Sequence, residues 1–183
     1  MYKECKSPRT RQRSQHMART LIHMMQREHF SSITISALCA EAQVPRKSFY
    51  RYFETKEDVF HLLVDTLLSE CIEYCSLGPL SQVPVSEDRL TLCFRFWLDH
   101  RQVFDAAQKS DMLSDVFSRM VHYYEIRFLS TDIAHEAPDS MIRLLFSVSG
   151  MMSIILQWYS QNFRQSPEEM ARMTLELLKN PLA

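Results

Sequence analysis

Apolar residues recur every three or four positions along most of the chain, which is the period of an amphipathic α-helix. In residues 10–28, for example, Met17, Leu21, Met24 and Met25 form one stripe, and the arginines lie mostly off it. No segment has a convincing strand pattern. We therefore predict an all-α chain of nine helices, over residues 10–28, 34–42, 45–53, 55–75, 86–100, 102–109, 111–130, 138–163 and 166–179.

Capping residues mark several of the predicted helix ends. Thr34 or Ser36 can cap the second helix, and Thr55 with Asp58 three residues later resembles a capping box at the start of the fourth. Pro45 suits the start of the third helix, because its missing N–H group would have no partner there. The run Ser166-Pro167-Glu168-Glu169 is a strong start for the last helix.

The fourth predicted helix has apolar residues on more than one face, so we expect it to contact two partners and to connect two parts of the chain. The clearest linker follows it, SLGPLSQVPVS over residues 76–86, with two prolines and a glycine. We predict a head over residues 1–55, of which about 1–9 form a flexible basic tail, and a helical body over residues 56–183.

The chain has 183 residues and two glycines, where average usage of about 7% would give about thirteen. Folds with many tight turns need glycine at positive φ, so this count argues against barrels and sandwiches. Gly78 and Gly150 lie too far apart to form a P-loop or a dinucleotide-binding loop. The glycine count therefore supports a helical chain with short connections.

Charge is distributed unevenly. Residues 1–60 hold 11 Lys and Arg against 6 Asp and Glu, whereas residues 61–183 hold 10 against 16. This asymmetry suggests a basic end that faces nucleic acid, or a basic tail that only aids solubility.

No secretory leader is evident, and the five cysteines have no C-x-x-C spacing, so we expect reduced thiols and a cytoplasmic protein. The apolar stretch from Met141 to Tyr159 is interrupted by Arg143 and several polar residues, which predicts a buried helix instead of a membrane span.

The segment ITISALCAEAQVPRKSFYRYFETKED, residues 33–58, predicts two short helices separated by a tight turn, which is a helix-turn-helix. Arg46 and Lys47 lie at the start of the second short helix, where they can reach base edges or phosphates. Polar side chains that can bind phosphate oxygens surround them, namely Thr34, Ser36, Ser48, Tyr50, Tyr52 and Lys56.

These residues resemble the TetR (tetracycline-repressor) family of transcriptional regulators. The resemblance covers about residues 10–60 and is most specific in Ser48-Phe49-Tyr50-Arg51-Tyr52-Phe53 followed by Lys56-Glu57-Asp58. It implies an all-α homodimer whose last two helices pair with those of the partner, a body with an inducer pocket, and the third helix as the recognition helix. By position, Arg46, Lys47 and Ser48 match base or phosphate contacts, Tyr50 matches a packing and backbone contact, and Tyr52 and Lys56 match phosphate contacts.

Two residues depart from the family pattern. Gln43 stands in the turn where family members usually have glycine, and Pro45 stands where they usually have a serine or threonine cap. A positive φ at Gln43 would cost about 1 kcal/mol. Pro45 offers no capping oxygen, so the recognition helix can start differently from that of its relatives.

The body carries two further sets of candidate residues, each of which can also be ordinary core. An excess of aromatic and Met side chains suits a pocket for an apolar or planar effector, lined by Cys71, Phe94, Trp97, Phe104, Met120 and Tyr124. Apolar residues beyond the need of one helix face suit a symmetric dimer interface, formed by Met151, Ile155, Trp158, Met170, Met173 and Leu177.

Cys71 and Cys75 lie one helical turn apart, at i and i+4. They form either a redox or metal switch or, more simply, a buried and inert pair. Two thiols without a further ligand at a suitable spacing make a poor metal site, so we expect no metal and no cofactor.

We therefore expect a sequence-specific DNA-binding regulator, a repressor that binds a near-palindromic operator as a homodimer and is released by a small effector. One alternative is a regulator whose body binds a protein partner instead. Another is a helical module that binds nucleic acid without sequence preference, which differs in its salt-sensitive but sequence-blind binding. An enzyme is not expected, because the sequence has no glycine-framed serine, zinc motif or paired carboxylates.

Overall fold

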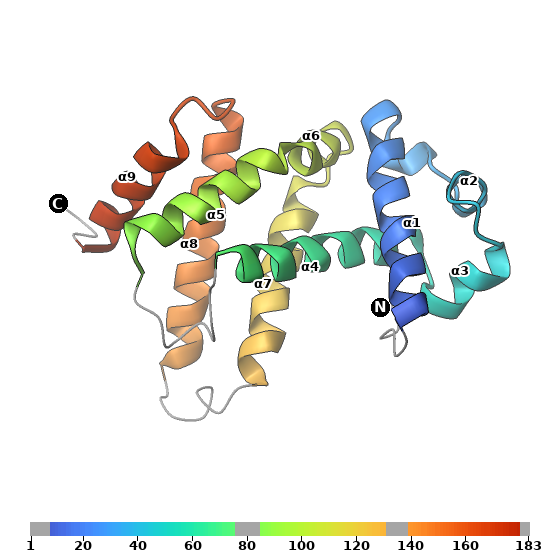
Figure 1. Ribbon diagram of the computed structural model, residues 1–183, viewed down its shortest axis with the longest axis horizontal. Helices are drawn as coiled ribbons and strands as arrows, with labels where there is room; N and C mark the ends of the chain where they lie inside the picture. Colours follow the sequence, from blue (N-terminus) through green and yellow to red (C-terminus); the bar gives the residue numbers. More distant parts are fainter. Residues whose placement is uncertain (1–7, 76–84, 131–138, 180–183) are drawn as a thin grey trace. The chain divides into compact units, whose positions relative to one another are not determined.

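The computed structural model describes residues 8–75, 85–130 and 139–179, and these ranges hold nine α-helices and one 3₁₀ turn (Figure 1). The helices of the N-terminal part are α1 (Pro8–Arg27), α2 (Ile35–Glu41), α3 (Arg46–Tyr52) and α4 (Lys56–Tyr74), with the turn η1 (Phe30–Ser32) after α1. They are followed by α5 (Glu87–Asp99), α6 (Arg101–Lys109), α7 (Leu113–Leu129), α8 (Ser140–Ser160) and α9 (Pro167–Lys179). The predicted all-α fold of nine helices is confirmed.

Most predicted helix starts have the expected caps. Thr34 accepts a hydrogen bond from the Ala37 amide at 3.0 Å, and Ser86 accepts one from Arg89 at 3.4 Å. At α9, the Glu169 amide donates to Ser166 Oγ and the Ser166 amide donates to the Glu169 carboxylate, which completes a capping box. Three predicted features lie wholly or partly outside the described residues, namely residues 76–84 of the linker predicted at 76–86, residues 1–7 of the basic tail, and Pro138 at the predicted start of α8.

The chain divides into two compact units. The first combines Met1–Leu67 with Gln102–Arg119, and the second combines Leu68–Arg101 with Met120–Ala183. The predicted head, residues 1–55, is thus part of a larger first unit that also takes in the start of α4, nearly all of α6 and the start of α7. The sequence of α4 runs from the first unit into the second.

In the first unit, α1 buries one face and packs against α2, which packs in turn on α3. Met17, Leu21 and Met25 are fully buried on α1, as expected from their spacing. His16 on α1 contacts the Ala42 carbonyl at the end of α2 with its Nε2 atom at 3.1 Å, and α1 packs on α2 and α2 on α3. These contacts hold α2 and α3 in place against α1.

Three helices end in a left-handed turn without glycine. After α2, Gln43 has φ 53°, its amide donates to Ala40 O, and the Val44 amide donates to Cys39 O at 2.9 Å. This pair of bonds is a Schellman motif. The same two bonds close α6, with Asp111 at φ 56°, and α8, with Asn162 at φ 55°. Glutamine, aspartate and asparagine thus take the place that glycine usually fills.

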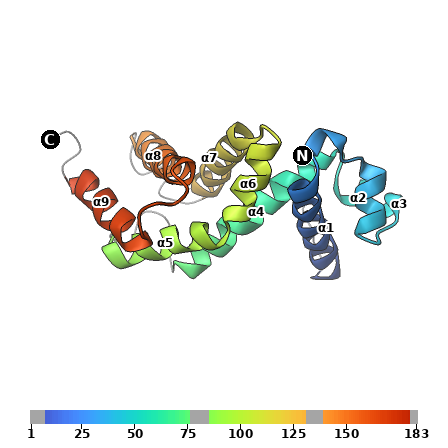
Figure 2. The ribbon, with the colours of Figure 1, turned by 90° about the horizontal axis from the view of Figure 1, so that it is seen from above.

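In the second unit α5 and α9 run side by side (Figures 1 and 2). Arg95 of α5 bonds Glu168 of α9 at 2.6 Å. Trp158 of α8 is 1% exposed, packs edge-on against Phe94 with ring centroids 5.4 Å apart, and donates its indole N–H to Gln165 O at 3.0 Å. Trp158 therefore joins α5, α8 and the turn before α9.

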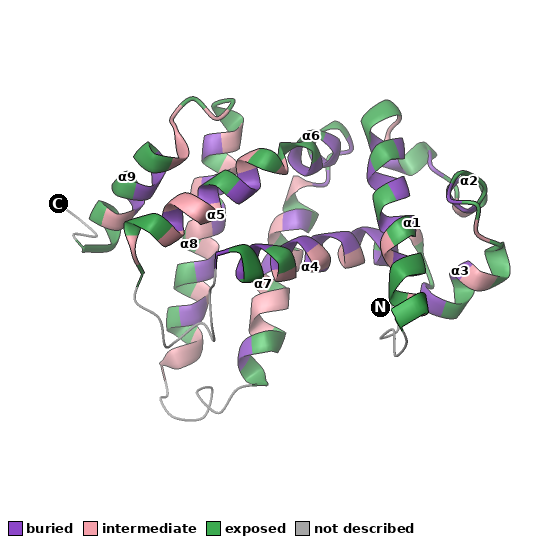
Figure 3. Ribbon diagram, in the orientation of Figure 1, coloured by how far each residue is buried: buried purple, intermediate pink, exposed green. Residues whose placement is uncertain are grey.

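The long helix α8 is apolar on the outside as well as the inside. Of the helices in the ranges described, α8 alone is long and apolar enough to cross a membrane by length and composition. Only 22% of its apolar stretch is buried in the chain itself, and Figure 3 shows exposed residues between the buried ones along the helix. Such a pattern is typical of a helix that faces the core on one side and offers an apolar surface on another.

Candidate nucleic-acid interface

Helix α3 has one buried face and one exposed polar face. Phe49 and Phe53 are buried one turn apart, with ring centroids 5.4 Å apart, and Tyr52 is 8% exposed beside them. Arg46 and Lys47 are exposed, and so is Arg51 at the other end of the helix. The packing of the aromatic residues therefore turns a row of cationic side chains to the surface.

Tyr50 lies on the exposed face, with 48% of its surface accessible. Its ring packs edge-on against Phe49, and its hydroxyl accepts a hydrogen bond from Arg46 Nη2 at 3.4 Å. The guanidinium carbon of Arg46 lies 6.0 Å from the centre of the Tyr50 ring. Arg46 and Tyr50 thus form a pair on the surface, and Tyr50 is not a core residue.

Two residues of the predicted contact set are used inside the protein. Tyr52 belongs to the buried face of α3, because at about 3.6 residues per turn it lies about 200° around the helix from the exposed Tyr50. Lys56 donates its three N–H groups to the carbonyl oxygens of Phe30 at 2.6 Å, Ile33 at 2.8 Å and Ser31 at 3.3 Å. Because an ammonium group has three donors, Lys56 holds the backbone between α1 and α2 and has none left for a phosphate.

The turn before α3 explains how the helix starts without the usual residues. Gln43 keeps the left-handed backbone expected of a glycine, with φ 53°. Pro45 lies at the N-cap, one residue before the first helical position, and provides no side-chain cap. The Ser48 amide instead bonds Pro45 O at 2.7 Å. The turn geometry is therefore kept, and the N-terminal amides of α3 have no capping side chain.

Thr34 and Ser36 lie at the start of α2 and are both exposed. The Thr34 hydroxyl caps the helix through the Ala37 amide, so its oxygen accepts that bond and its O–H group remains a donor. Ser48, half-buried on α3, is the other serine of the set. The hydroxyl groups thus come from the starts of the two helices of the helix-turn-helix.

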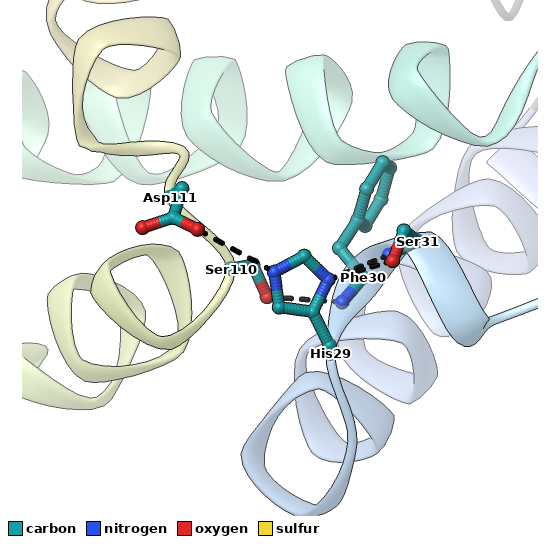
Figure 4. A network of polar contacts seen from close by, with 5 residues as sticks. All are labelled: His29, Phe30, Ser31, Ser110 and Asp111. Atoms are coloured by element: carbon teal, nitrogen blue, oxygen red, sulfur yellow. Dashed lines mark hydrogen bonds and ion pairs between the residues drawn. The ribbon is translucent and has the colours of Figure 1, made fainter.

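A polar network braces the turn before α2 (Figure 4). The Phe30 amide donates to Ser110 Oγ at 3.0 Å in a buried contact, and His29 Nε2 lies 3.7 Å from the Asp111 carboxylate. Lys109 Nζ donates to the Gln26 carbonyl at 2.9 Å. The turn between α6 and α7 therefore holds the end of α1, within the first unit.

The predicted effector residues are divided between the two units. Phe104 is buried in the first unit, whereas Phe94, Trp97, Met120 and Cys71 are buried in the second. Tyr124 interacts there with the thiols of Cys71 and Cys93, and its pKa is raised, first by burial and then by these thiols. The structure thus brings together Cys71, Trp97 and Tyr124, and adds Cys93, which the sequence interpretation did not select.

The predicted dimer residues are also divided, between interior and surface. Ile155, Trp158 and Met170 are buried within the single chain, and Trp158 packs against Phe94 of α5. Met173 and Leu177 are 55% and 50% exposed, and Met151 is half-buried. The sequence interpretation missed Ile142 and Phe146 of α8, which are 70% and 73% exposed and lie one turn apart.

Comparison with known protein families matches both parts of the chain. Residues 22–63 match the N-terminal region of the tetR family of bacterial regulatory proteins, and residues 87–180 match a transcriptional regulator C-terminal region. Comparison with curated protein sequences gives no match.

Solved structures with the same fold include a TetR-family transcriptional regulator from Syntrophomonas wolfei, 16% identical, with a TM-score of 0.61 over 92% of this chain and 94% of that one. The fatty acid degradation regulator FadR from Bacillus halodurans is 12% identical, with a TM-score of 0.55 over 96% of each chain. FadR from Bacillus subtilis, solved in complex with stearoyl-CoA, is 13% identical, with a TM-score of 0.57 over 92% of this chain and 99% of that one. At these identities the likeness shows the fold.

A helix-turn-helix with an exposed basic recognition helix, followed by a helical body, defines a DNA-binding transcriptional regulator. The chain belongs to the TetR family.

Proposed function

We propose that this regulator is a cytoplasmic repressor that binds its operator through α3. The observation that carries this proposal is the exposed row of Arg46, Lys47 and Tyr50 opposite the buried Phe49. Arginine and lysine at the start of a recognition helix read guanine edges or bind phosphates. Thr34, Ser36 and Ser48 donate to phosphates, which set the register of the helix on the duplex.

We further propose that the regulator acts as a homodimer. The exposed apolar side chains of Ile142 and Phe146 on α8, and of Met173 and Leu177 on α9, need a cover that the single chain does not provide. A Cβ on Gly150 of the same helix would meet nothing within 4 Å, so this position leaves room for another helix to approach closely. A two-fold dimer presents two copies of α3, and the operator is then a near-palindrome with half-sites about 34–36 Å apart.

Release by a small effector is the third part of the proposal. The buried aromatic and sulfur-containing side chains around Trp97, Met120 and Tyr124 are the environment expected for an apolar or planar ligand. The FadR structure with stearoyl-CoA supports an apolar ligand, since it has the same fold. An effector that prefers one conformation of the dimer would shift the population away from the DNA-binding form.

The test begins with selection of bound sequences from a random duplex library by the full chain. Arg46→Ala and Lys47→Ala should then weaken binding to the selected operator by about 5–150-fold each, which corresponds to about 1–3 kcal/mol for a specific contact. Arg164→Ala is the matched control, because Arg164 is an exposed arginine in the other unit. Unchanged binding by the two α3 variants, or an equal loss in the control, would overturn the assignment of α3.

A further inference from the structure

Three cysteine thiols meet inside the second unit. Cys71 and Cys75 lie one turn apart on and just after α4, with their sulfur atoms 3.9 Å apart, and Cys93 comes from α5. The three sulfur atoms all lie within 4.8 Å of one another. None of the three is in a disulfide.

The spacing of these sulfur atoms is that of a thiolate metal site. A Zn²⁺ ion bonds each thiolate at about 2.3 Å, so its sulfur ligands stand about 3.8–4.0 Å apart in tetrahedral or trigonal geometry. The measured separation of Cys71 and Cys75 is 3.9 Å, and Cys93 lies within reach of both. Small side-chain rotations are enough to place all three sulfurs around one ion.

A partly buried arginine lies near the three thiols. The positive charge of the Arg89 guanidinium acts on the Cys75 thiol. Arg89 Nη1 is itself buried and has no hydrogen-bond partner within the part of the chain that the structure describes. A buried cation of this kind is costly unless an anion offsets it, and a cluster of thiolates supplies that anion.

We propose that Cys71, Cys75 and Cys93 form a binding site for one soft, thiophilic metal cation such as Zn²⁺, Cd²⁺ or Cu⁺. Thiolate ligands select these ions over harder cations. Each thiol that binds gives its proton to the solvent, so binding strengthens as the pH rises. The bound ion would join α4 to α5, because Cys71 and Cys75 come from the end of α4 and Cys93 comes from α5.

Of these three cysteines, Cys71 also belongs to the residues that we predict to line the effector pocket, so the metal site would adjoin that pocket and take a different ligand. It does not depend on operator binding, because metal affinity is measured on the protein alone. If the chain binds metal and no DNA, the metal site is supported and the proposed function is contradicted. If it binds its operator and no metal, the proposed function is supported and the metal site is contradicted.

The experiment titrates the reduced, metal-free full chain with Cd²⁺ and follows the ultraviolet charge-transfer absorption of cadmium–thiolate bonds. A Cys5→Ser background removes the thiol that lies outside the described residues. We expect a plateau at one ion per chain. Cys71→Ser, Cys75→Ser and Cys93→Ser should each weaken binding by more than about 100-fold, since even changes behind the ligands cost about 10–100-fold.

Cys39→Ser is the matched control, because Cys39 is a buried free cysteine of the first unit, outside the cluster. It should bind Cd²⁺ as the parent does. A second measurement needs no cluster variant: alkylation followed by peptide mass analysis should show that Cd²⁺ protects the three cluster thiols and leaves Cys39 unchanged. The proposal would be overturned if the absorption reached no plateau, or if Cys39→Ser lost as much Cd²⁺ affinity as the cluster variants. It would also be overturned if Cys93→Ser bound Cd²⁺ as tightly as the parent, or if Cys71 and Cys75 formed a disulfide in place of metal binding.

Discussion

Gln43 occupies a backbone position that the physics of L-amino acids disfavours. Its φ of 53° is forced by the Schellman motif that ends α2, in which the amides of Gln43 and Val44 bond the carbonyls of Ala40 and Cys39. A side chain in the left-handed region costs about 1–2 kcal/mol, because Cβ approaches the following carbonyl oxygen. The motif sets the direction of α3, so the recognition helix depends on a residue that carries local strain.

Replacing Gln43 by glycine should therefore stabilise the protein. The relief of about 1–2 kcal/mol is offset by about 0.4–1 kcal/mol of extra chain entropy in the unfolded state, which leaves a gain of about 0.5–1 kcal/mol. Urea unfolding of the full chain measures this free energy. Gln43→Ala is the control, since alanine keeps Cβ and should give no comparable gain; an equal gain in both variants would contradict the strain argument.

Lys56 shows how one residue type can serve either DNA or the protein. Its ammonium group bonds the carbonyls of Phe30, Ser31 and Ile33 and lies 4.4 Å from the centre of the Phe30 ring. The three bonds tie the start of α4 to the segment that leads into α2. A lysine in the family pattern is thus a structural residue here, and its charge stabilises the turn instead of a phosphate.

At the scale of elements, α4 and α7 are joined by a nearly buried ion pair in the first unit. Arg119 donates to the two carboxylate oxygens of Asp65 at 2.7 and 2.5 Å, and both side chains are mostly buried. His61 lies one turn before Asp65 on α4. Burial first, and then the positive charge of Arg119, lower the pKa of His61, while Asp58, Asp65 and Asp115 act in the opposite direction.

This arrangement makes stability depend on pH. The unfolded chain binds a proton at His61 as the pH falls below 6.5, whereas the folded chain resists it because its pKa is lowered. The unfolded state then binds more protons, so the free energy of unfolding decreases as the pH falls from 6.5 toward the folded pKa and is unaffected above 6.5. Denaturant unfolding at about pH 7.5 and about pH 5.5 should show a smaller loss in His61→Asn than in the parent.

His23→Gln is the control for that comparison, because His23 is exposed on α1. It should lose as much stability on acidification as the parent does. If His61→Asn behaved like His23→Gln, the lowered pKa of the partly buried His61 would not be the source of the acid sensitivity.

At the scale of the whole molecule, the apolar outer face of α8 and α9 accounts for the proposed dimer. Phe146 is the most exposed of its large apolar residues at 73%, and Ile142 precedes it by one turn at 70%. In a two-fold interface each of these residues contributes from both copies of the chain. Dimerisation would therefore remove their apolar surface from water in both copies, which stabilises the dimer.

Phe146→Glu should therefore yield a monomer, since a carboxylate cannot be buried without a partner. Sedimentation at micromolar concentration should give a dimer for the parent chain, with affinity reduced by more than about 100-fold in the variant, from the loss of about 3 kcal/mol or more for a buried Phe. Gln108→Glu introduces the same charge at an exposed position of α6 and should remain dimeric. A parent chain that sediments only as a monomer would exclude this interface.

Local patterns were enough to predict much of this protein. The 3.6-residue period, the serine and threonine caps and the proline at the start of α9 act within one or two turns, so the helices and most of their ends were predictable from the sequence. The helix-turn-helix and its exposed Arg46 and Lys47 were predictable for the same reason. The low glycine count predicted a helical chain. It did not exclude left-handed turns, because Gln43 adopts a positive φ where family members usually have glycine.

Only the tertiary structure decided which side chains meet across elements. Tyr52 is buried and Tyr50 is exposed because the burial of Phe49 and Phe53 sets which face of α3 packs against the first unit. Lys56 meets carbonyls 23 to 26 residues away, and Cys93 meets Cys71 and Cys75 from another helix. No spacing in the sequence encodes such contacts, because the distance between two helices depends on how all of their side chains pack.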